Sequence, residues 1–383
     1  MTSSNPFNLI TQLAAAASSG RRAVVATLVA RSGATFRPPG ARMVVVEGGQ
    51  RYGSISAGCV EAEIAMHAEA VLESGGPLLV TISTGSEQEI YFGTGTGCDG
   101  EMQILLEIAA DKGALVAPYD VIAPAIMSRA PIVLATRVDS GPNTPPRVTQ
   151  AWRIGASPAA GWGGDATVRA ALCRLLDETQ TSGAHLDASC IAGVTGIASD
   201  ETVCLIERIE PALRLVVCGA GPVAEALSSI AAQLGWRVTG VDRRATFATE
   251  AFFPGAETVV CGAYTDIAAL IPTDARTAAV LLSHNLLDDA ALLRGFLDTP
   301  VAAVSIVSSV TRAQRIFAQL AEDGRPVTAA DREGIFAPAG LDIGAETPEE
   351  IALAIVAELQ AHITGRAGAP LRIVRSKPQA VAT

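Results

Sequence analysis

The first hundred residues alternate between helical and strand-like spacing of apolar side chains. Residues 5–19 have the spacing of a helix, and a glycine ends it before the valine-rich run 23–30, which suits a buried strand. Residues 31–40 are rich in glycine and proline and predict a loop. The runs 43–47 and 51–56 flank a pair of glycines and therefore predict a β-hairpin.

A second helix is predicted directly after this hairpin. Residues 60–72 place apolar side chains on one helical face, and a further pair of glycines follows them. Strand-like runs come next at 78–83 and 102–107. The segment 93–100 between them holds four glycines in eight residues, too many for a regular element. Such a density indicates a backbone that is exposed or that a ligand can approach.

Residues 111–210 have the weakest pattern in the chain. The runs 132–137 and 148–154 look like strands, 155–165 reads as a loop, and 166–177 has helical spacing. This segment contributes least to the fold assignment.

The second half has a clear order of elements. A strand at 213–217, a helix at 222–234 and a strand at 237–241 make one βαβ unit. Thr347 opens a capping box before the last helix, which has Pro348 at its first position. The other predicted elements are strands at 258–261, 278–282 and 302–307, and helices at 289–297 and 312–323.

Length and composition place these elements in an α/β protein of two domains. The chain has 383 residues, more than one core usually fills, and is 49% hydrophobic but only 4% aromatic, as buried parallel strands and their helices require. We expect an N-terminal mixed α/β domain at 1–210, within which 111–210 is the poorly patterned part. A Rossmann-like domain with a parallel sheet is expected at 211–364, and a flexible tail at 365–383.

Charge and the length of the apolar runs argue against two classes of partner, nucleic acid and membrane. The net charge is −11 and the basic residues are scattered, so the basic stripe of a nucleic-acid-binding protein is absent from the sequence. The N-terminus lacks the basic start and apolar run of a signal peptide, and no apolar stretch reaches the roughly 18 residues of a membrane span. We therefore expect a cytoplasmic protein that binds neither nucleic acid nor membrane.

The cysteines and histidines argue against disulfides and against a metal site built by the protein. The seven cysteines form no Cys-x-x-Cys pair, and their odd number in a long chain favours reduced thiols. The four histidines are isolated from one another and from the cysteines. No spacing resembles a zinc site.

A glycine loop follows the first strand of the βαβ unit. Gly219 and Gly221 belong to the sequence Gly-Ala-Gly-Pro-Val-Ala, which matches the G-x-G-x-x-G/A pattern that brings a pyrophosphate to a helix N-terminus. Asp242 ends the next strand, where an acid can bind a ribose hydroxyl. Pro222 removes one backbone N–H, and Arg243 with its neighbouring arginine could accept an extra phosphate, so the ligand need not be NAD. The structural alternative is tight packing of strand on helix.

Four side chains outside the loop are candidates for chemistry. Cys59 and Cys98 lie in glycine-bearing turns, and Cys59 also precedes a helix whose dipole favours a thiolate. Small buried hydrophobes are the alternative for both. Glu61 is a candidate general base, although helix stabilisation also explains it. His284 follows a strand at the edge where doubly wound sheets bind ligands, and we interpret it as a ligand contact.

Four motifs stand out along the chain. They are Gly-Ala-Arg-Met at 40–43, Gly-Ser-Ile-Ser-Ala-Gly-Cys-Val-Glu at 53–61, Gly-Cys-Asp-Gly at 97–100 and Gly-Leu-Asp-Ile-Gly-Ala-Glu-Thr-Pro-Glu-Glu-Ile at 340–351. Taken together, they resemble motifs of the XdhC/CoxI family, the xanthine dehydrogenase accessory proteins. The first three resemble the family's N-terminal module, and the last resembles its C-terminal Rossmann module.

This resemblance implies a cofactor chaperone rather than a catalyst. Such a protein binds the molybdenum cofactor, as molybdopterin or its dinucleotide form, helps it receive sulfur from a cysteine desulfurase and passes it to a molybdenum hydroxylase apoenzyme. An acidic protein with an alanine- and valine-rich surface also suits a homodimer. The positions that match the family's motifs are Cys59, Glu61, Cys98, Gly219, Gly221 and Asp242.

Two other functions remain open at this point. The unit from Gly219 to Asp242 also suits an NAD(P)-dependent oxidoreductase, in which the N-terminal module would bind a small substrate. Against this, no Lys, Tyr or His pairing beside the loop suggests hydride chemistry. The third possibility is an assembly scaffold that retains a nucleotide fold and binds only a partner enzyme.

Overall fold

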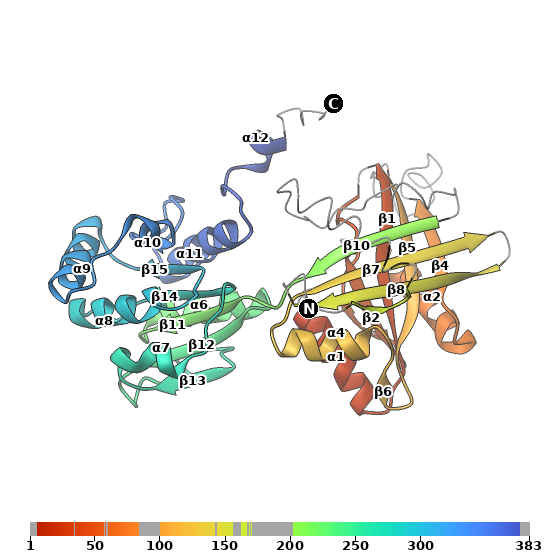
Figure 1. The fold of residues 1–383 in the computed structure, drawn as a ribbon, viewed down its shortest axis with the longest axis horizontal. Helices are drawn as coiled ribbons and strands as arrows, with labels where there is room; N and C mark the ends of the chain where they lie inside the picture. The colour runs from red at the N-terminus through yellow and green to blue at the C-terminus, as the bar shows by residue number, and fades with distance from the viewer. Residues whose placement is uncertain are drawn as a thin grey trace. The chain divides into compact units, whose positions relative to one another are not determined.

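The structure is a computed structural model, and the described residues form two compact units, which divide the chain at 212/213 (Figure 1). The described residues are 6–33, 35–56, 58, 60–83, 100–141, 144–155, 162–166, 168, 170 and 202–375. No helix within these ranges is long and apolar enough to cross a membrane.

The first unit contains an antiparallel sheet in the order β3-β2-β1-β5-β4, with the short β6 paired to β5. The strands β2 and β3 form the hairpin that the sequence predicts, and β4 has the predicted bounds. The strands are β1 Ala23–Gly33, β2 Arg42–Val46, β3 Gln50–Gly53, β4 Leu78–Ser83, β5 Gly100–Asp111 and β6 Ala114–Leu115.

Helices cover both faces of this sheet. Successive strand residues point to opposite sides, so the apolar strands present an apolar face on each side for a helix to bury. Helix α1 (Pro6–Ser18) packs its buried face on one side, together with Val25 of β1. Helix α2 (Glu61–Ser74) packs on the other side, together with Val24. Gly75 ends α2 in the left-handed conformation, as the sequence predicts.

A second antiparallel sheet, in the order β10-β7-β8-β9, completes the first unit. Val29 and Leu105 of the first sheet share a buried cluster with Val138 and Leu205 of the second, so the two sheets pack on each other. Helix α4 (Tyr119–Met127) adds its apolar face to the α1 cluster. The strands are β7 Ile132–Gly141, β8 Thr144–Ile154, β9 Trp162–Gly164 and β10 Thr202–Ile209.

Several predictions in the first unit were wrong in detail. Strand β1 continues to Gly33, into the predicted loop, because Arg31 and Gly33 pair with the extended β5. The predicted loop 155–165 contains β9, which pairs with β8. Helix α4 and strand β10 were not predicted at all. Most of the predicted helix 166–177 lies outside the described residues.

The second unit is built on a six-stranded parallel sheet in the order β13-β12-β11-β14-β15-β16. The chain order reverses between β11 and β14, which makes this the switch point at which such sheets bind ligands beyond the carboxyl ends of their strands. The strands are β11 Arg214–Cys218, β12 Arg237–Asp242, β13 Thr258–Cys261, β14 Thr277–Leu281, β15 Ala303–Ile306 and β16 Ile335–Phe336.

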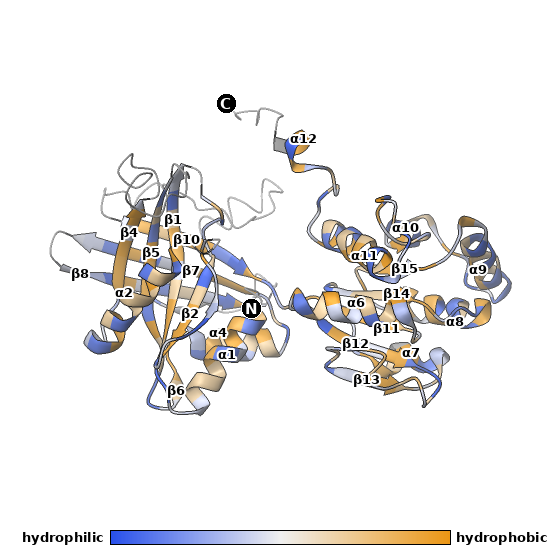
Figure 2. Cartoon of the chain, turned by 180° about the vertical axis from the view of Figure 1, so that it is seen from behind, coloured by the Kyte–Doolittle hydropathy of each residue, from blue (hydrophilic) through white to orange (hydrophobic). Residues whose placement is uncertain are grey.

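Helices cover both faces of the parallel sheet, and apolar residues follow its strands (Figure 2). Helices α6 (Pro222–Gln233) and α11 (Pro348–Ile363) pack on one face. Helices α8 (Leu286–Leu297) and α9 (Val310–Glu322) pack on the other. The remaining described elements are η1 Tyr264–Asp266, α7 Ile267–Leu270, α10 Ala329–Glu333 and α12 Leu371–Arg375.

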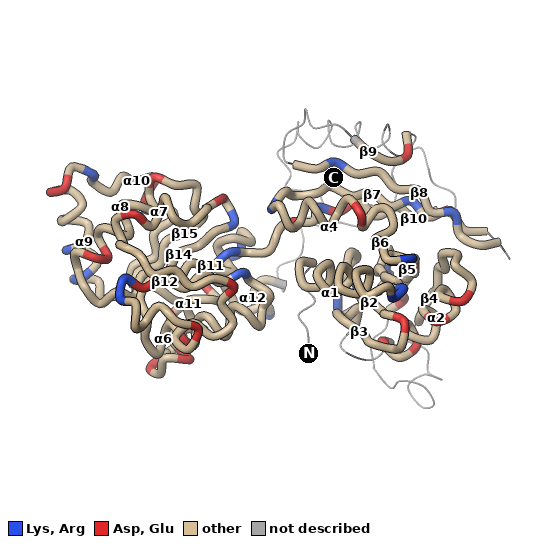
Figure 3. Tube along the Cα trace, turned by 90° about the horizontal axis from the view of Figure 1, so that it is seen from below, with Lys and Arg blue, Asp and Glu red and all other residues tan. Residues whose placement is uncertain are grey.

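The predicted α/β class with a C-terminal Rossmann-like sheet is confirmed. The βαβ unit and the capping box before α11 lie where the sequence placed them. Helix α8 begins three residues earlier than predicted, because Asn285 caps it by accepting hydrogen bonds from the N–H groups of Leu287 and Asp288. The two-residue strand β16 was not predicted. Charges of both signs are interspersed along the trace (Figure 3).

Candidate functional site

The glycine loop lies between β11 and α6, at the carboxyl edge of the parallel sheet. Gly219 has a φ of 106°, and a Cβ atom there would lie 2.6 Å from the backbone carbonyl of Leu282, the residue after β14. The N–H of Gly219 donates to the carbonyl of Val241 at 2.8 Å. Gly219 is therefore required by the protein's own packing of the loop against the backbone after β14, a different contact from the strand-on-helix packing considered in the sequence.

Gly221 is different, because the protein does not fill the space beside it. Its backbone is extended, and a Cβ atom there would meet no heavy atom within 4 Å. It is the N-cap of α6 and provides no side chain to cap the helix, while Pro222 occupies the first helical position. The positive end of the α6 dipole therefore adjoins open space, into which an anionic group fits.

Asp242 ends β12 and is fully buried. Its Oδ2 accepts hydrogen bonds from the N–H of Ala220 at 2.9 Å and from Nη2 of Arg244 at 2.8 Å. Its Oδ1 accepts from the backbone N–H and from Nε of Arg244, at 2.8 and 2.9 Å. Burial would raise the pKa of this carboxyl, but the bonds from Arg244 and Ala220 outweigh burial and lower it. Both oxygens of the ionised acid are thus engaged by the chain itself.

Two arginines follow Asp242 and remain half exposed. The guanidinium of Arg244 lies 3.9 Å above the ring of Phe247, and its side chain is 49% exposed. Nε of Arg243 lies 3.0 Å from Oδ2 of Asp288, and the Arg243 side chain is 52% exposed. The end of β12 therefore presents guanidinium groups to solvent, beside the glycine loop.

His284 lies at the same edge of the sheet, after the neighbouring strand β14. It is exposed and has a φ of 59°, which is uncommon for a residue other than glycine. A Cβ atom on Gly219 would lie 2.9 Å from the backbone nitrogen of Ser283. The fold therefore brings the glycine loop and the His284 turn together, as expected from the sequence.

A buried acid holds the His284 turn in place. Asp289 is 1% exposed, and its Oδ1 accepts hydrogen bonds from the hydroxyl and the N–H of Ser283, at 2.5 and 3.3 Å. Its Oδ2 pairs with Arg312 of α9. This network was missed in the sequence, where Asp289 was only the first residue of the predicted helix 289–297.

The segment before Cys59 is anchored by Glu61, the first residue of α2. One oxygen of Glu61 accepts hydrogen bonds from the N–H groups of Ile55 and Ser56, at 3.1 and 2.8 Å, and from the Ser54 hydroxyl at 2.6 Å. The other accepts from the Ser56 hydroxyl at 2.7 Å. Burial would raise the pKa of Glu61, but these bonds outweigh it and lower the pKa. The carboxylate is engaged in holding the turn.

Cys59 and Cys98 themselves lie outside the described residues. Three other cysteines are described, and they form no disulfide with one another. Cys218 on β11 is buried, and burial raises the pKa of its thiol, whereas Cys261 at the end of β13 is exposed. Within the described part of the chain, no group of three or more His, Cys, Asp or Glu side chains could hold a metal ion.

A buried cluster of ionisable groups lies between the two sheets of the first unit. Arg42 of β2 forms an ion pair with Glu207 of β10, although both are largely buried. Glu107 of β5 lies near Arg42, and Gln150 Nε2 donates to it at 3.3 Å. Burial raises the pKa of Glu107 to about 7. None of these residues was a candidate at the level of sequence.

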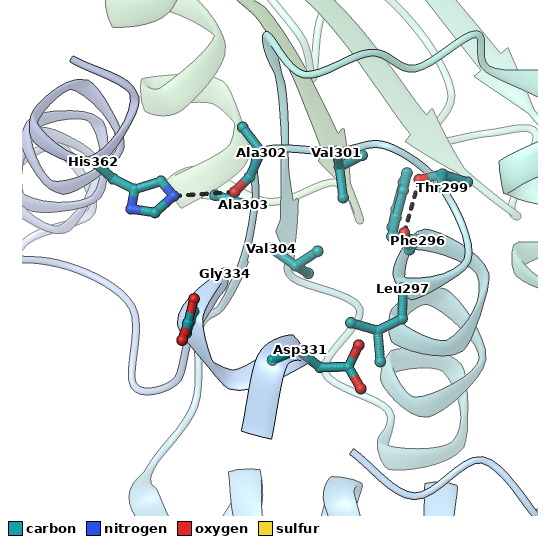
Figure 4. A pocket seen from close by; sticks show the side chains of 12 residues that line it. Phe296, Leu297, Thr299, Val301, Ala302, Ala303, Val304, Asp331, Gly334 and His362 are labelled. Carbon is teal, nitrogen blue, oxygen red and sulfur yellow. Dashed lines mark hydrogen bonds between the residues drawn. The ribbon is translucent and has the colours of Figure 1, made fainter. Parts of the chain in front are cut away.

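A cavity of about 360 Å³ opens at the opposite edge of the parallel sheet (Figure 4). Its wall includes Phe296 and Val304, and Asp331 lies at one side. His362 of α11 bonds to the carbonyl of Ala302 at 3.1 Å, just before β15 begins. Because these residues mark the amino ends of the strands, the cavity is separate from the glycine loop.

Each unit contains a segment that matches a known family model. Residues 215–359 match the family model described as the XdhC Rossmann domain, and residues 16–83 match that of the XdhC and CoxI family.

Individual relatives agree with these matches. A probable xanthine dehydrogenase subunit from Bacillus subtilis (strain 168) is 26% identical over 355 residues, which cover 92% of this chain and 96% of that protein. The molybdenum cofactor insertion chaperone PaoD of Escherichia coli (strain K12) is 41% identical over 78 residues, or 20% of this chain and 21% of PaoD. A crystal structure described as a xanthine dehydrogenase from Bacillus halodurans has a TM-score of 0.71 at 23% identity, over 95% of this chain and 99% of that one, and it supports the fold.

Proposed function

Because the chain belongs to the XdhC/CoxI family, we propose that it binds the molybdenum cofactor, supports its sulfuration and delivers it to a molybdenum hydroxylase of the xanthine dehydrogenase type. Its similarity to a molybdenum cofactor insertion chaperone supports the role in delivery. According to this proposal, the protein is a carrier and the cofactor is its cargo. Its partners are a cysteine desulfurase and the hydroxylase apoenzyme.

One observation carries the binding part of the proposal. The open space at Gly221 adjoins the positive end of α6, and the half-exposed guanidinium of Arg244 bonds to the same Asp242 oxygen as the Ala220 N–H of the loop. Backbone amides, a helix dipole and arginine are the groups that bind phosphate in proteins. The cofactor is a pterin that ends in a phosphate or pyrophosphate, so the donor set fits this end of the cargo. We place His284, at the same edge, as a further contact.

The reactive end of the cofactor needs soft ligands. Thiolates suit molybdenum and sulfur chemistry, and we assign this role to Cys59 and Cys98. Glu61 then serves as a positioning residue, because its four hydrogen bonds fix the turn that leads into Cys59. A carboxylate with a lowered pKa is a weak base, which favours positioning over proton transfer.

The experiment is to purify the full chain from molybdate-fed cells and to measure bound molybdenum and pterin. The purified protein is then mixed with a hydroxylase apoenzyme, and the activity that appears is recorded. We expect Cys59→Ala and Cys98→Ala to lower cofactor retention or apoenzyme activation without changing the melting temperature. Cys204→Ala, which changes a half-buried thiol on β10 of the first unit, is the matched control.

Two outcomes contradict the proposal in different ways. Retention and activation by both cysteine variants at the wild-type level would remove the role of the thiols. A wild-type protein that binds no pterin and activates no apoenzyme would remove the chaperone function itself.

An NADP-dependent oxidoreductase is the second candidate, because the Rossmann loop is followed by two arginines that suit a 2′-phosphate. NAD fits less well, since Asp242 already uses both oxygens within the protein. Titration with NADP⁺, followed by reduction tests on candidate substrates, separates this function from the chaperone.

A further inference from the structure

We propose that Arg244 is a specificity-determining residue, which withdraws Asp242 from ribose recognition and makes this edge of the sheet a site for a phosphate monoester. The inference rests on the proposed function only for the location of the ligand at the glycine loop. It names the ligand chemistry that the loop selects.

The acid at the end of β12 is not available to a ribose. In a Rossmann site that binds an unphosphorylated ribose, the acid at the end of the second strand accepts hydrogen bonds from the ribose hydroxyls. Asp242 holds that position but is 0% exposed and accepts four hydrogen bonds, three of them from Arg244. A ribose could reach the carboxylate only by breaking these charge-assisted bonds.

The charges that face a ligand at this edge are positive. Arg243 and Arg244 each pair with one acid, so the formal charges of the two pairs cancel. The arginines are nevertheless more exposed than the acids. Their side chains are 52% and 49% exposed, whereas those of Asp288 and Asp242 are 21% and 0% exposed. A ligand approaching this edge meets guanidinium groups rather than carboxylates.

The guanidinium of Arg244 is close to the glycine loop and held in a fixed plane. The Ala220 N–H and Arg244 Nη2 donate to the same oxygen of Asp242, so the guanidinium lies beside the loop. The bonds to Asp242 use Nε and Nη2, and among the described residues Nη1 has no protein partner. Stacking on Phe247 fixes the plane of the group. A phosphate bound at the loop can therefore be bonded by a pre-oriented arginine.

These features define a chemical class of ligand. A phosphate monoester carries up to two negative charges and three terminal oxygens, and arginine pairs with such a group at two points. A neutral ribose diol provides neither. The monoester can be the terminal phosphate of a pterin or the 2′-phosphate of a dinucleotide, and the two sources are separated by experiment.

The test uses two pairs of probes that differ by one phosphate. The full chain is titrated by calorimetry with NAD⁺ and NADP⁺, and with 6-hydroxymethylpterin and its phosphate ester. We expect the phosphorylated member of at least one pair to bind at least about tenfold more tightly, the usual effect of one charge-assisted arginine contact. The pair that shows this preference identifies the source of the phosphate.

Variants assign the preference to Arg244. Arg244→Ala is expected to reduce the preference severalfold and to strengthen binding of NAD⁺, because Asp242 then loses the two side-chain hydrogen bonds from Arg244. Arg244→Lys should retain part of the preference. Arg237→Ala, at the other end of β12 and paired with Glu257, is the matched control and should leave the preference unchanged. If Arg244→Ala fails to fold, Arg243→Ala tests the second guanidinium. The preference of this variant for the phosphorylated probe should also fall.

The inference is overturned by equal binding within both pairs, by no measurable binding of any of the four probes, or by an unchanged preference in the folded variants. Its failure can be told from failure of the proposed function. A protein that prefers NADP⁺ over NAD⁺ but retains no molybdenum or pterin supports this inference and contradicts the chaperone. A protein that retains the cofactor but shows no phosphate preference supports the chaperone and contradicts this inference.

Discussion

Arg42 on β2 and Glu207 on β10 lie 165 residues apart in the sequence and form a two-point ion pair that joins the two sheets of the first unit. Nη1 donates to Oε2 at 2.8 Å, and Nη2 bonds to Oε1. The two side chains are only 14% and 6% exposed. A buried ion pair of this kind holds the two sheets together only while both partners are present, because either charge alone would be buried without solvation.

Glu207→Gln is therefore expected to destabilise the protein by about 3 kcal/mol, since it leaves the Arg42 charge buried without its counterion. Urea unfolding followed by circular dichroism measures the change. Glu47→Gln is the matched control, because Glu47 pairs with Arg22 in a salt bridge whose side chains are 45% and 39% exposed. We expect a small effect there. Equal effects of the two substitutions would show that burial of the Arg42 pair is unimportant.

Glu107 predicts a dependence of stability on pH. Burial raises its folded-state pKa to about 7, from 4.5 in the unfolded chain. The folded protein then holds a proton that the unfolded chain releases, so stability falls as the pH rises from 4.5 to 7 and levels off above this range. Glu107→Gln removes the effect and should stabilise the protein at about pH 8 by about 2 to 3 kcal/mol, but hardly at about pH 4.5.

The measurement is urea unfolding of wild type and Glu107→Gln at about pH 4.5, 6 and 8. Glu101→Gln, an exposed position on the same strand, is the control for removal of one negative charge. A difference between wild type and Glu107→Gln that stays constant with pH would contradict the assigned titration.

Glu61 and Glu63 differ in contacts although both open α2. Glu61→Gln should weaken the turn before Cys59, because an amide has one acceptor oxygen where the carboxylate uses two. We expect a loss of about 1 to 2 kcal/mol and lower cofactor retention. Glu63 is 46% exposed, so Glu63→Gln is the control. Retention that falls equally in both variants would point to helix charge rather than to the turn.

The two glycines of the loop should respond in opposite ways to alanine. Gly219→Ala places a Cβ atom 2.6 Å from the Leu282 backbone at a φ of 106°, so a loss of about 3 kcal/mol or more in stability is expected. Gly221→Ala meets no protein atom and should melt like wild type. Its methyl group enters the open space, and phosphate binding should weaken. Thermal melting and calorimetric titration with NADP⁺ and the pterin phosphate separate the two effects.

Local pattern predicted the second unit well. The βαβ unit, the glycine loop and the capping box at Thr347 each depend on residues close together in sequence, where apolar spacing and backbone capping determine the element. The first unit was harder. Strand β10 pairs with β7 across a gap of more than sixty residues, and no local signal reports such a pairing.

The sequence by itself determined where the glycine loop would form and which acid would end the following strand. Only the tertiary structure decided how that acid is used. Asp242 accepts hydrogen bonds from Ala220, which follows the neighbouring strand β11, and from Arg244, and it is fully buried. The reason is physical, because hydrogen-bond partners and exposure depend on which segments the fold brings together, whereas periodicity and capping depend only on neighbours along the chain.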